Sequence, residues 1–235
     1  YQQFNGFDTL NLSQITATEF TTRIRWTKDE EFLSGSFDRT ALRSPYPILS
    51  FQGIFGFKDV LGSDYNYQKL EFQFEHNTQL GVLGRMRYGF TLGYINGIAA
   101  YPLLKVHEGN QSLWLLTSTA NMVNFLEFIS DRYVVGFAEN RWEGLLFDRI
   151  PLIKASKIRL ITTERIMLGS LSTQQNEALL IPSFVKPFNG VPYVEIGVGI
   201  ENILKVIRID LLYRATHQIP GTSPFSIKAR YSINF

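Results

Sequence analysis

Hydrophobic and polar residues alternate along much of this chain with a period of two. The odd positions from 225 to 235 hold Phe, Ile, Ala, Tyr, Ile and Phe, whereas the even positions hold Ser, Lys, Arg, Ser and Asn. Residues 207–216 and 193–201 alternate in the same way. Such alternation is typical of β-strands that have one apolar and one polar face. The pattern therefore predicts amphipathic strands.

The same alternation recurs from near the start of the chain to its end. It is clear over residues 19–26, 69–75, 80–92, 193–201, 207–216 and 225–235, and less regular over 31–39, 48–59, 111–123, 126–142 and 157–171. Turn-forming residues such as His76-Asn77-Thr78 fall between segments, and longer connections are expected over 97–110, 143–156 and 173–190. We expect about 11 strands. Because no linker divides the chain, residues 1–235 are predicted to form one domain.

Composition narrows the classes of protein that fit this pattern. The chain has 235 residues, 45% of them hydrophobic, and no Cys, which excludes a disordered chain, a disulfide scaffold and a zinc-cysteine site. The formal net charge is +2, with 23 Lys and Arg against 21 Asp and Glu, so no electrostatic field argues for nucleic acid as a partner. No apolar run is long enough for a transmembrane helix.

Alternation alone fits both a soluble sandwich and a transmembrane barrel, because each buries one strand face and wets the other. Strands of roughly 10 residues favour the membrane, since that length crosses a bilayer when the strand is tilted. Full charges on the polar face favour a water-filled lumen, and we predict a lumenal charge ladder there. The ladder residues are Glu195, Arg208, Asp210, Arg214, Lys228 and Arg230.

The end of the chain resembles the β-signal of bacterial outer-membrane barrels, whose last strand ends in an aromatic residue. Tyr231, Ile233 and Phe235 carry this resemblance. Bacterial barrels close with an even number of strands. Either a strand in residues 1–12 completes the count, or the chain is the C-terminal part of a larger barrel. We expect the second: an all-β, antiparallel transmembrane β-barrel with 11 or 12 strands here out of about 16.

Two further resemblances point to named families. Gly197-Val-Gly-Ile200 followed by Ile207-Arg-Ile-Asp210 and a last strand is similar to the closing strands of the Omp85-like (surface antigen) superfamily. Residues 101–112, 124–134 and 145–154 resemble a Bacteroidota outer-membrane family of unknown function, whose longer members place a carboxypeptidase-regulatory-like domain ahead of the barrel.

The chain departs from the Omp85 pattern at one point. Omp85 proteins carry an Arg-Gly-aromatic motif on a loop inside the lumen, and this sequence has only the scrambled Arg87-Tyr-Gly-Phe90. The resemblance implies a location in the bacterial outer membrane and a non-catalytic role in protein insertion, translocation or envelope assembly. The alternatives are a passive or gated pore and a structural subunit of a larger envelope complex. The implied partners are the lipid bilayer, the outer-membrane assembly machinery and other envelope proteins.

No arrangement of residues predicts an enzyme, a cofactor site or a metal site. His76, His107 and His217 are far apart in sequence and are expected in turns or loops. Gly197 and Gly199 lack the helix and third glycine of a nucleotide site, and are expected to allow curvature or close approach of other groups. Glu127, Asp131 and Arg132 have two interpretations: a cluster that fixes a loop, or ordinary ion pairing at the start of a strand.

Overall fold

The computed structural model describes residues 2–5, 8–11, 15–35, 39–41, 44–142, 158–179 and 181–231. Most of these residues form one nine-stranded sheet in which every neighbouring pair of strands is antiparallel. Its strands, in spatial order, are β15 (Phe225–Tyr231), β14 (Ile207–Arg214), β13 (Tyr193–Ile203), β12 (Arg159–Ser170), β11 (Arg132–Trp142), β8 (Arg85–Asn96), β7 (Tyr67–Gln79), β6 (Ile48–Gly56) and β3 (Glu19–Thr27).

Short elements occupy the connections and the N-terminal region. The short strands pair as β1 (Gln2–Asn5) with β2 (Asp8–Asn11), β4 (Phe32–Ser34) with β5 (Arg39–Ala41), and β9 (Lys105–Val106) with β10 (Ile129–Ser130). The helical turns are η1 (Gly81–Leu83), η2 (Tyr101–Leu103) and α2 (Thr173–Ala178). No helix among the residues that the structure describes is long and apolar enough to cross a membrane.

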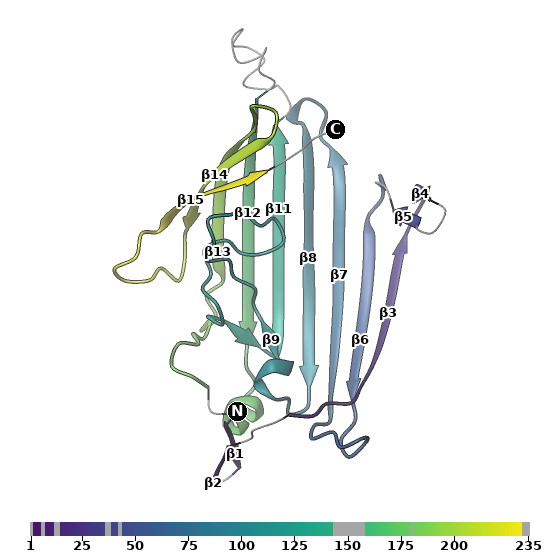
Figure 1. Cartoon of the computed structure of the whole chain (residues 1–235), viewed down its shortest axis with the longest axis vertical. Helices are drawn as coiled ribbons and strands as arrows, with labels where there is room; N and C mark the ends of the chain where they lie inside the picture. Colours follow the sequence, from purple (N-terminus) through teal and green to yellow (C-terminus); the bar gives the residue numbers. More distant parts are fainter. Residues whose placement is uncertain are drawn as a thin grey trace.

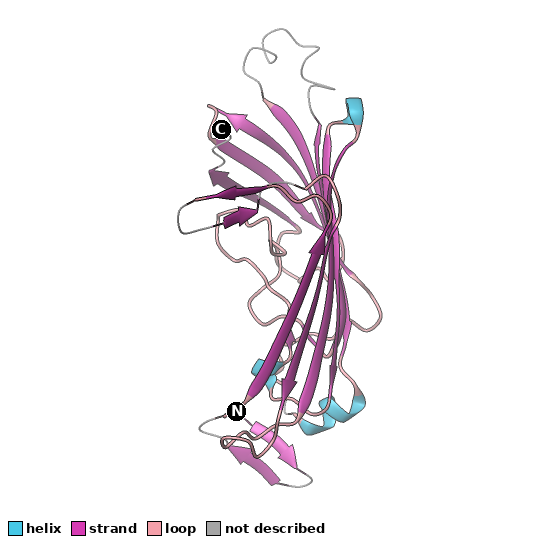
Figure 2. Ribbon diagram, turned by 90° about the vertical axis from the view of Figure 1, so that its right-hand side faces the viewer, coloured by secondary structure: helices cyan, strands magenta, loops and turns pink. Residues whose placement is uncertain are grey.

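The sheet is curved, and its long connections lie on one side of it (Figures 1 and 2). Residues 97–131, which join β8 to β11, cross in front of β11 to β13 in Figure 1. We call residues 97–131 the covering segment, the sheet face beneath it the inner face, and the opposite face the outer face.

The strand register separates the two faces by residue type. On β13, Val194, Ile196, Val198 and Ile200 alternate with Glu195, Gly197 and Gly199. Strand pairing places residues of the same face opposite each other on β12, β13 and β14. Large apolar side chains are exposed along the whole outer face. They are Phe20, Ile24, Trp26, Phe51, Phe90, Leu92, Tyr94, Val134, Ile166, Leu168, Ile196, Val198, Ile200, Ile209, Leu211, Phe225, Ile227 and Tyr231.

The buried apolar residues lie between the inner face and the connections that cover it. One cluster joins Tyr67 and Ile95 of the sheet to Ala99 and Leu104 of the covering segment. A second joins Met167 and Tyr193 of the sheet to Val123 and Phe128 of the covering segment and to Phe188. The covering segment therefore packs against the sheet as part of one folded unit.

The all-β antiparallel fold is confirmed, but its details differ from the expectation. Nine of the described strands form one open sheet with β3 and β15 at its edges, where 11 or 12 strands of a larger barrel were expected. The described strands do not close into a barrel by themselves. Residues 111–123 do not form a strand, and make only isolated bridges such as Trp114 with Ala229. The connection expected over 143–156, and residues 145–154 within the family resemblance, lie outside the described residues.

The turn predicted at His76-Asn77-Thr78 is also wrong, because these residues belong to β7. The chain reverses at residues 80–84 instead. Gly81 and Gly84 have φ values of 59° and 87° there, in the left-handed region that favours glycine.

Candidate functional site

The structure places the six residues of the predicted charge ladder on the inner face of three neighbouring strands. Glu195 lies on β13, Arg208, Asp210 and Arg214 on β14, and Lys228 and Arg230 on β15. All are buried except Arg230, which is half-buried. The ladder is therefore covered by protein, and each charge needs a partner within the fold.

Arg208 is at the centre of a buried ionic network. Its guanidinium donates to both carboxylate oxygens of Asp210, each at 2.7 Å, and to Oε2 of Glu139 at 2.7 Å. Glu139 also contacts Arg141 at 3.1 Å, and Arg141 lies 3.6 Å from Glu201. Arg208 and Asp210 are 1% and 0% exposed, so the bidentate pair is isolated from solvent.

Two glycines of β13 leave space for neighbouring side chains, and one of them, Gly199, provides the space that Asp210 of this network requires. A Cβ atom on Gly199 would lie 2.6 Å from Cγ of Asp210, and one on Gly197 would lie 2.4 Å from Oγ1 of Thr163. Both distances are too short for a real contact. Of the two roles expected for these glycines, the close approach of neighbouring side chains is thus present in the structure.

The ladder holds the covering segment against the sheet. Arg214 donates to both carboxylate oxygens of Glu127, at 2.7 and 3.1 Å, and to the carbonyl oxygen of Met122 at 2.8 Å. Burial raises the pKa of Glu127, but hydrogen bonds from Arg214 and from the Asn124 amide outweigh it and leave the pKa below its usual value. Glu127 therefore stays ionised, and it fixes a loop, as the first of its two interpretations proposed.

Glu195 holds the same segment through its backbone. The carboxylate accepts hydrogen bonds from the amides of Asn121 at 3.1 Å and Met122 at 2.8 Å, and from the hydroxyl of Tyr193 at 2.7 Å. The side chain of Asn121 in turn satisfies the backbone of Leu116. These contacts explain how an irregular segment is buried without a ladder of strand hydrogen bonds.

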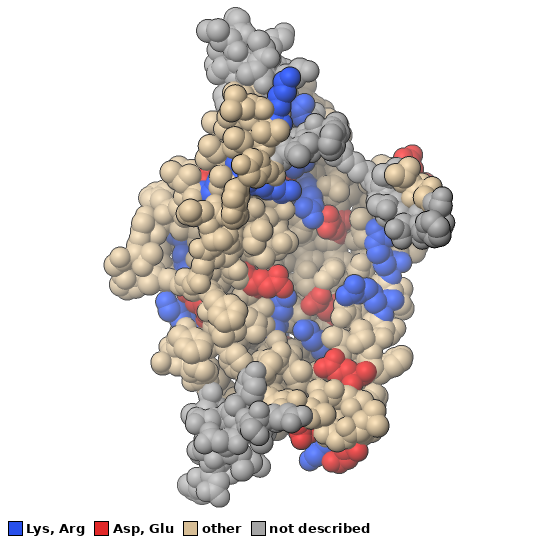
Figure 3. Space-filling model, in the orientation of Figure 1, with Lys and Arg blue, Asp and Glu red and all other residues tan. Residues whose placement is uncertain are grey.

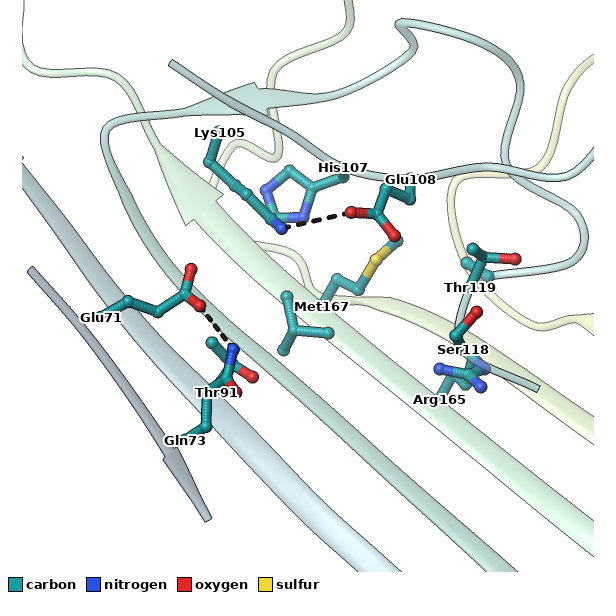
Figure 4. A pocket seen from close by; sticks show the side chains of 12 residues that line it. Glu71, Gln73, Thr91, Lys105, His107, Glu108, Ser118, Thr119, Arg165 and Met167 are labelled. Atoms are coloured by element: carbon teal, nitrogen blue, oxygen red, sulfur yellow. Dashed lines mark hydrogen bonds and ion pairs between the residues drawn. The ribbon is translucent and has the colours of Figure 1, made fainter. Parts of the chain in front are cut away.

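Polar cavities remain between the covering segment and the sheet. One has a volume of about 200 Å³ and is lined by side chains that include Glu71, Lys105, His107, Glu108 and Arg165 (Figure 4). Arg165 donates to the carbonyl oxygen of Thr117, and the Lys105 ammonium lies 3.8 Å from Glu108. Side chains of both charge signs therefore line this cavity.

The inner face is more open toward β3, β6, β7 and β8. Figure 3 shows Lys, Arg, Asp and Glu side chains at the surface beside the covering segment. A cavity of about 400 Å³ lies there, and Asn77, Arg85, Arg87, Glu139 and Arg141 are among its lining residues. The half of the inner face away from β15 therefore presents polar side chains to solvent.

One of the three histidines departs from the expectation of turns and loops. His76 belongs to β7, where its ring contacts the Tyr88 hydroxyl at 3.2 Å and the Pro45 carbonyl at 3.1 Å. His107 lies in a loop, as expected, but its side chain is buried, at 1% exposure. Only His217 lies in a partly exposed connection, 2.8 Å from the Val191 carbonyl.

His107 and Ser130 form a buried pair that resembles half of a nucleophile-base arrangement. Nε2 of His107 lies 3.0 Å from Oγ of Ser130, but Nδ1 is buried without a hydrogen-bond partner among the described residues. Burial, together with a smaller effect of the positive charge of Lys105, lowers the pKa of His107 to about 3. Among the residues that the structure describes, no carboxylate orients the His107 ring, and Ser130 is 0% exposed, so this pair lacks both an oriented base and access for a substrate.

The remaining predicted residues have other positions. Asp131 accepts a hydrogen bond from the Ser172 amide at 2.9 Å, and the guanidinium of Arg132 lies over the ring of Tyr94 at 5.3 Å. Tyr231 is the last residue of β15, and Ile233 and Phe235 lie outside the described residues. Within the described ranges, no group of three or more His, Asp or Glu residues is placed to hold a metal ion.

Sequence reasoning missed Glu139, Arg141 and Glu201, which complete the Arg208 network. The inner face of β11 carries Tyr133, Val135 and Phe137 and then Glu139 and Arg141. Because the character of this face changes partway along the strand, the alternation does not mark the two charged residues as part of a polar face. Their partner Arg208 is 69 residues from Glu139 in sequence. Only the strand order brings them together.

Comparison with known proteins gives a family but no activity. No curated protein matches the chain. A family model described as the C-terminal domain of a family of unknown function, DUF5686, matches residues 3–200. This match confirms the resemblance to a family of unknown function, while the relation to Omp85-like proteins and to Bacteroidota stays a prediction. Because the match covers most of the chain, this protein belongs to the DUF5686 family through its C-terminal domain.

Proposed function

We propose that the nine-stranded sheet is part of the wall of a bacterial outer-membrane β-barrel. In this proposal the outer face contacts lipid, further strands pair with the edges of β3 and β15, and the covering segment fills part of the lumen. The protein acts without catalysis in the insertion, translocation or assembly of envelope proteins. The observation that carries the proposal is the contrast between the two faces of the sheet.

The outer face is unusually apolar for a surface in water. Its exposed side chains include Trp26 at 59%, Val198 at 54% and Ile227 at 65% of their full accessibility, on strands at both edges and in the middle of the sheet. Soluble monomers rarely expose contiguous apolar patches larger than a few hundred Å². Lipid chains, or a second protein layer, must cover this face.

The position of the apolar residues along each strand favours lipid. Strand pairing links Trp26 on β3 to Val194 on β13 through Leu49, Phe74, Phe90, Gly136 and Ile166. Trp26 ends the outward apolar series of β3, which begins at Phe20, whereas Val194 begins the series of β13. We call the band of outward apolar residues across the sheet the apolar belt. Its position along the strand direction therefore changes from β3 to β13.

The size of this shift gives an angle. Along the strand direction the apolar belt is displaced by six residues, which is the separation of Phe20 and Trp26. This displacement accumulates over the six steps from each strand to the next between β3 and β13. One residue per step is about 3.3 Å along the strand for about 4.8 Å across the sheet. The strands are thus tilted by about 35° from the normal of the belt, within the range of roughly 35–45° found in membrane barrels.

Strand length and strand edges support the same interpretation. β7, β8, β11, β12 and β13 have 11 to 13 residues each, which suffices for a tilted strand to cross the hydrocarbon core. An open edge in lipid leaves backbone groups unpaired at a cost of several kcal/mol each. β3 and β15 therefore need pairing strands from outside the nine-stranded sheet.

The covered inner face favours an assembly role over a freely open pore. Glu195 on β13, Arg214 on β14 and Lys228 on β15 bind the covering segment, so this half of the lumen is filled. The similarity of the closing strands to Omp85-like proteins supports the same choice. A solute pore is the second candidate, and the polar surface beside β7 and β8, with its cavity of about 400 Å³, favours it.

The two candidates differ in the current that the full-length protein carries in a planar lipid bilayer. We expect the unaltered protein to insert into the bilayer without a steady open current level. The double variant Glu127→Gln with Glu195→Gln should carry intermittent current, because both changes weaken the attachment of the covering segment. A matched control is Glu108→Gln, the same chemical change at a carboxylate of the covering segment that is 65% exposed and pairs with Lys105 of that segment. Depletion of the protein in cells is expected to lower the amounts of other outer-membrane proteins. A steady current in the unaltered protein, with envelope protein levels unchanged on depletion, would support the pore instead.

A further inference from the structure

The covering segment reaches the free edge of the last strand and pairs with its backbone. The amide of Leu115 donates to the carbonyl of Ala229 at 2.8 Å, and the amide of Ala229 donates to the carbonyl of Leu113 at 3.1 Å. Trp114 thereby forms a parallel bridge with Ala229. Both backbone groups of Ala229 point away from β14 and are occupied by the chain itself.

Side chains of β15 reinforce this contact on both sides of the bridge. The buried ammonium of Lys228 donates to the carbonyls of Asn110 at 2.6 Å and Ser112 at 2.7 Å. Arg230 donates to the hydroxyl of Thr117 at 3.2 Å, and the rings of Trp114 and Tyr231 lie 5.5 Å apart. We call residues 110–117 the latch.

The edge that the latch occupies is the one a further strand would use. Amides in a strand point to alternate sides, so those of Ile227 and Tyr231 face the same way as the amide of Ala229. Ala229 lies near the middle of β15 (Phe225–Tyr231). A strand that pairs along the whole edge needs the backbone groups of Ala229, which the latch holds.

We infer that the edge of β15 facing away from β14 is the docking edge for one further β-strand of the same barrel, and that the latch and this strand exclude each other. The inference rests on the proposed function, in which β15 needs a pairing strand. The latch satisfies the edge at one residue, whereas a paired strand satisfies it along its length. The covering segment is thus a reversible occupant of the edge, and its release is coupled to strand pairing at β15.

Disulfide trapping in the full-length protein tests whether the latch forms. The chain contains no Cys, so the pair Trp114→Cys with Ala229→Cys introduces the only two thiols of this domain. We expect the disulfide to form on mild oxidation in liposomes, since directly paired residues lie within disulfide range. The positive control is Ile209→Cys with Ala229→Cys, a registered pair on β14 and β15. The negative control is Trp114→Cys with Thr22→Cys, because Thr22 lies on β3 at the opposite edge.

Mutual exclusion has its own measurement. A barrel closed along β15 is expected to remain compact in SDS without heating, so the oxidised Trp114 and Ala229 pair should lose the compact gel band and regain it on reduction. The Ile209 and Ala229 pair should keep the band in both states. If the Trp114 and Ala229 disulfide forms and the compact band is unchanged, the latch and the docked strand do not exclude each other. If this disulfide forms no more than in the negative control while the Ile209 and Ala229 disulfide forms, the latch is not present. Failure of every variant and of the unaltered protein to integrate into liposomes would count against the proposed function instead.

Discussion

Replacing Arg208 with alanine is expected to destabilise the protein by about 3–5 kcal/mol, the typical cost of removing one partner from a buried ion pair. The change leaves the carboxylates of Asp210 and Glu139 buried without their shared cation. Among the described residues, Arg141 contacts Glu139 and lies near Glu201, and neither contact places a cation on Asp210. The free energy of unfolding is measured by guanidinium titration of the protein refolded into liposomes, with the compact gel band as the signal for the folded state.

Arg230 provides the matched control for this prediction, because it lies directly opposite Arg208 in the register of β14 and β15. It is half-buried and donates one hydrogen bond, to Thr117, so Arg230→Ala is expected to cost about 1 kcal/mol. Adding Asp210→Ala to Arg208→Ala should cost less than the sum of the single changes, since the two residues share one network. Equal, small effects of Arg208→Ala and Arg230→Ala would contradict the buried network.

A positive charge in the middle of the outer face is expected to cost about 2–4 kcal/mol in a bilayer, the range for Arg at the midplane of a membrane barrel. Val198→Arg places that charge near the centre of β13. Leu204→Arg introduces the same side chain in the turn after β13, where the leucine is 82% exposed, and should cost less than about 1 kcal/mol. The measurement is again the free energy of unfolding in liposomes.

Glu164 allows the same environment to be tested with the opposite sign. It is exposed on the outer face of β12, and its register partners are Ala138 and Ile196. In contact with lipid this carboxyl group is unfavourable, so Glu164→Leu is expected to stabilise the protein by roughly 1–2 kcal/mol. If Val198→Arg is tolerated as well as Leu204→Arg and Glu164→Leu gives no gain, then hydrocarbon does not surround the outer face.

The sequence predicts the wall of this fold better than it predicts the covering segment. On β13, β14 and β15 every charged residue of the predicted ladder lies on the inner face, because a period of two sorts the side chains of a strand with little ambiguity. Residues 111–123 alternate weakly too, yet they form no strand. Their backbone groups are satisfied by side chains such as Glu195, which is 74 residues from Asn121. Local pattern carries no information on such distant partners.

The misplaced turn has a local explanation. His76, Asn77 and Thr78 are polar, and polar residues favour turns, but the His76 ring is held by Tyr88 on the paired strand. The reversal occurs where Gly81 and Gly84 adopt positive φ values. Likewise, the partners of the buried His107 are distant in sequence, so its isolated position in a polar stretch gives no signal of burial.

Spin labels on the outer face test the central claim most directly. Single cysteines at Val194, Ile196, Val198 and Ile200 can be labelled without background from this domain, which has no Cys, and Leu61 and Leu204 serve as water-exposed controls at 87% and 82% exposure. In liposomes, we expect the β13 labels to collide more with lipid-soluble oxygen than with a water-soluble nickel chelate. The control labels should show the reverse. Labels on β13 that are shielded from both reagents, in a protein that is monodisperse without detergent, would contradict this claim.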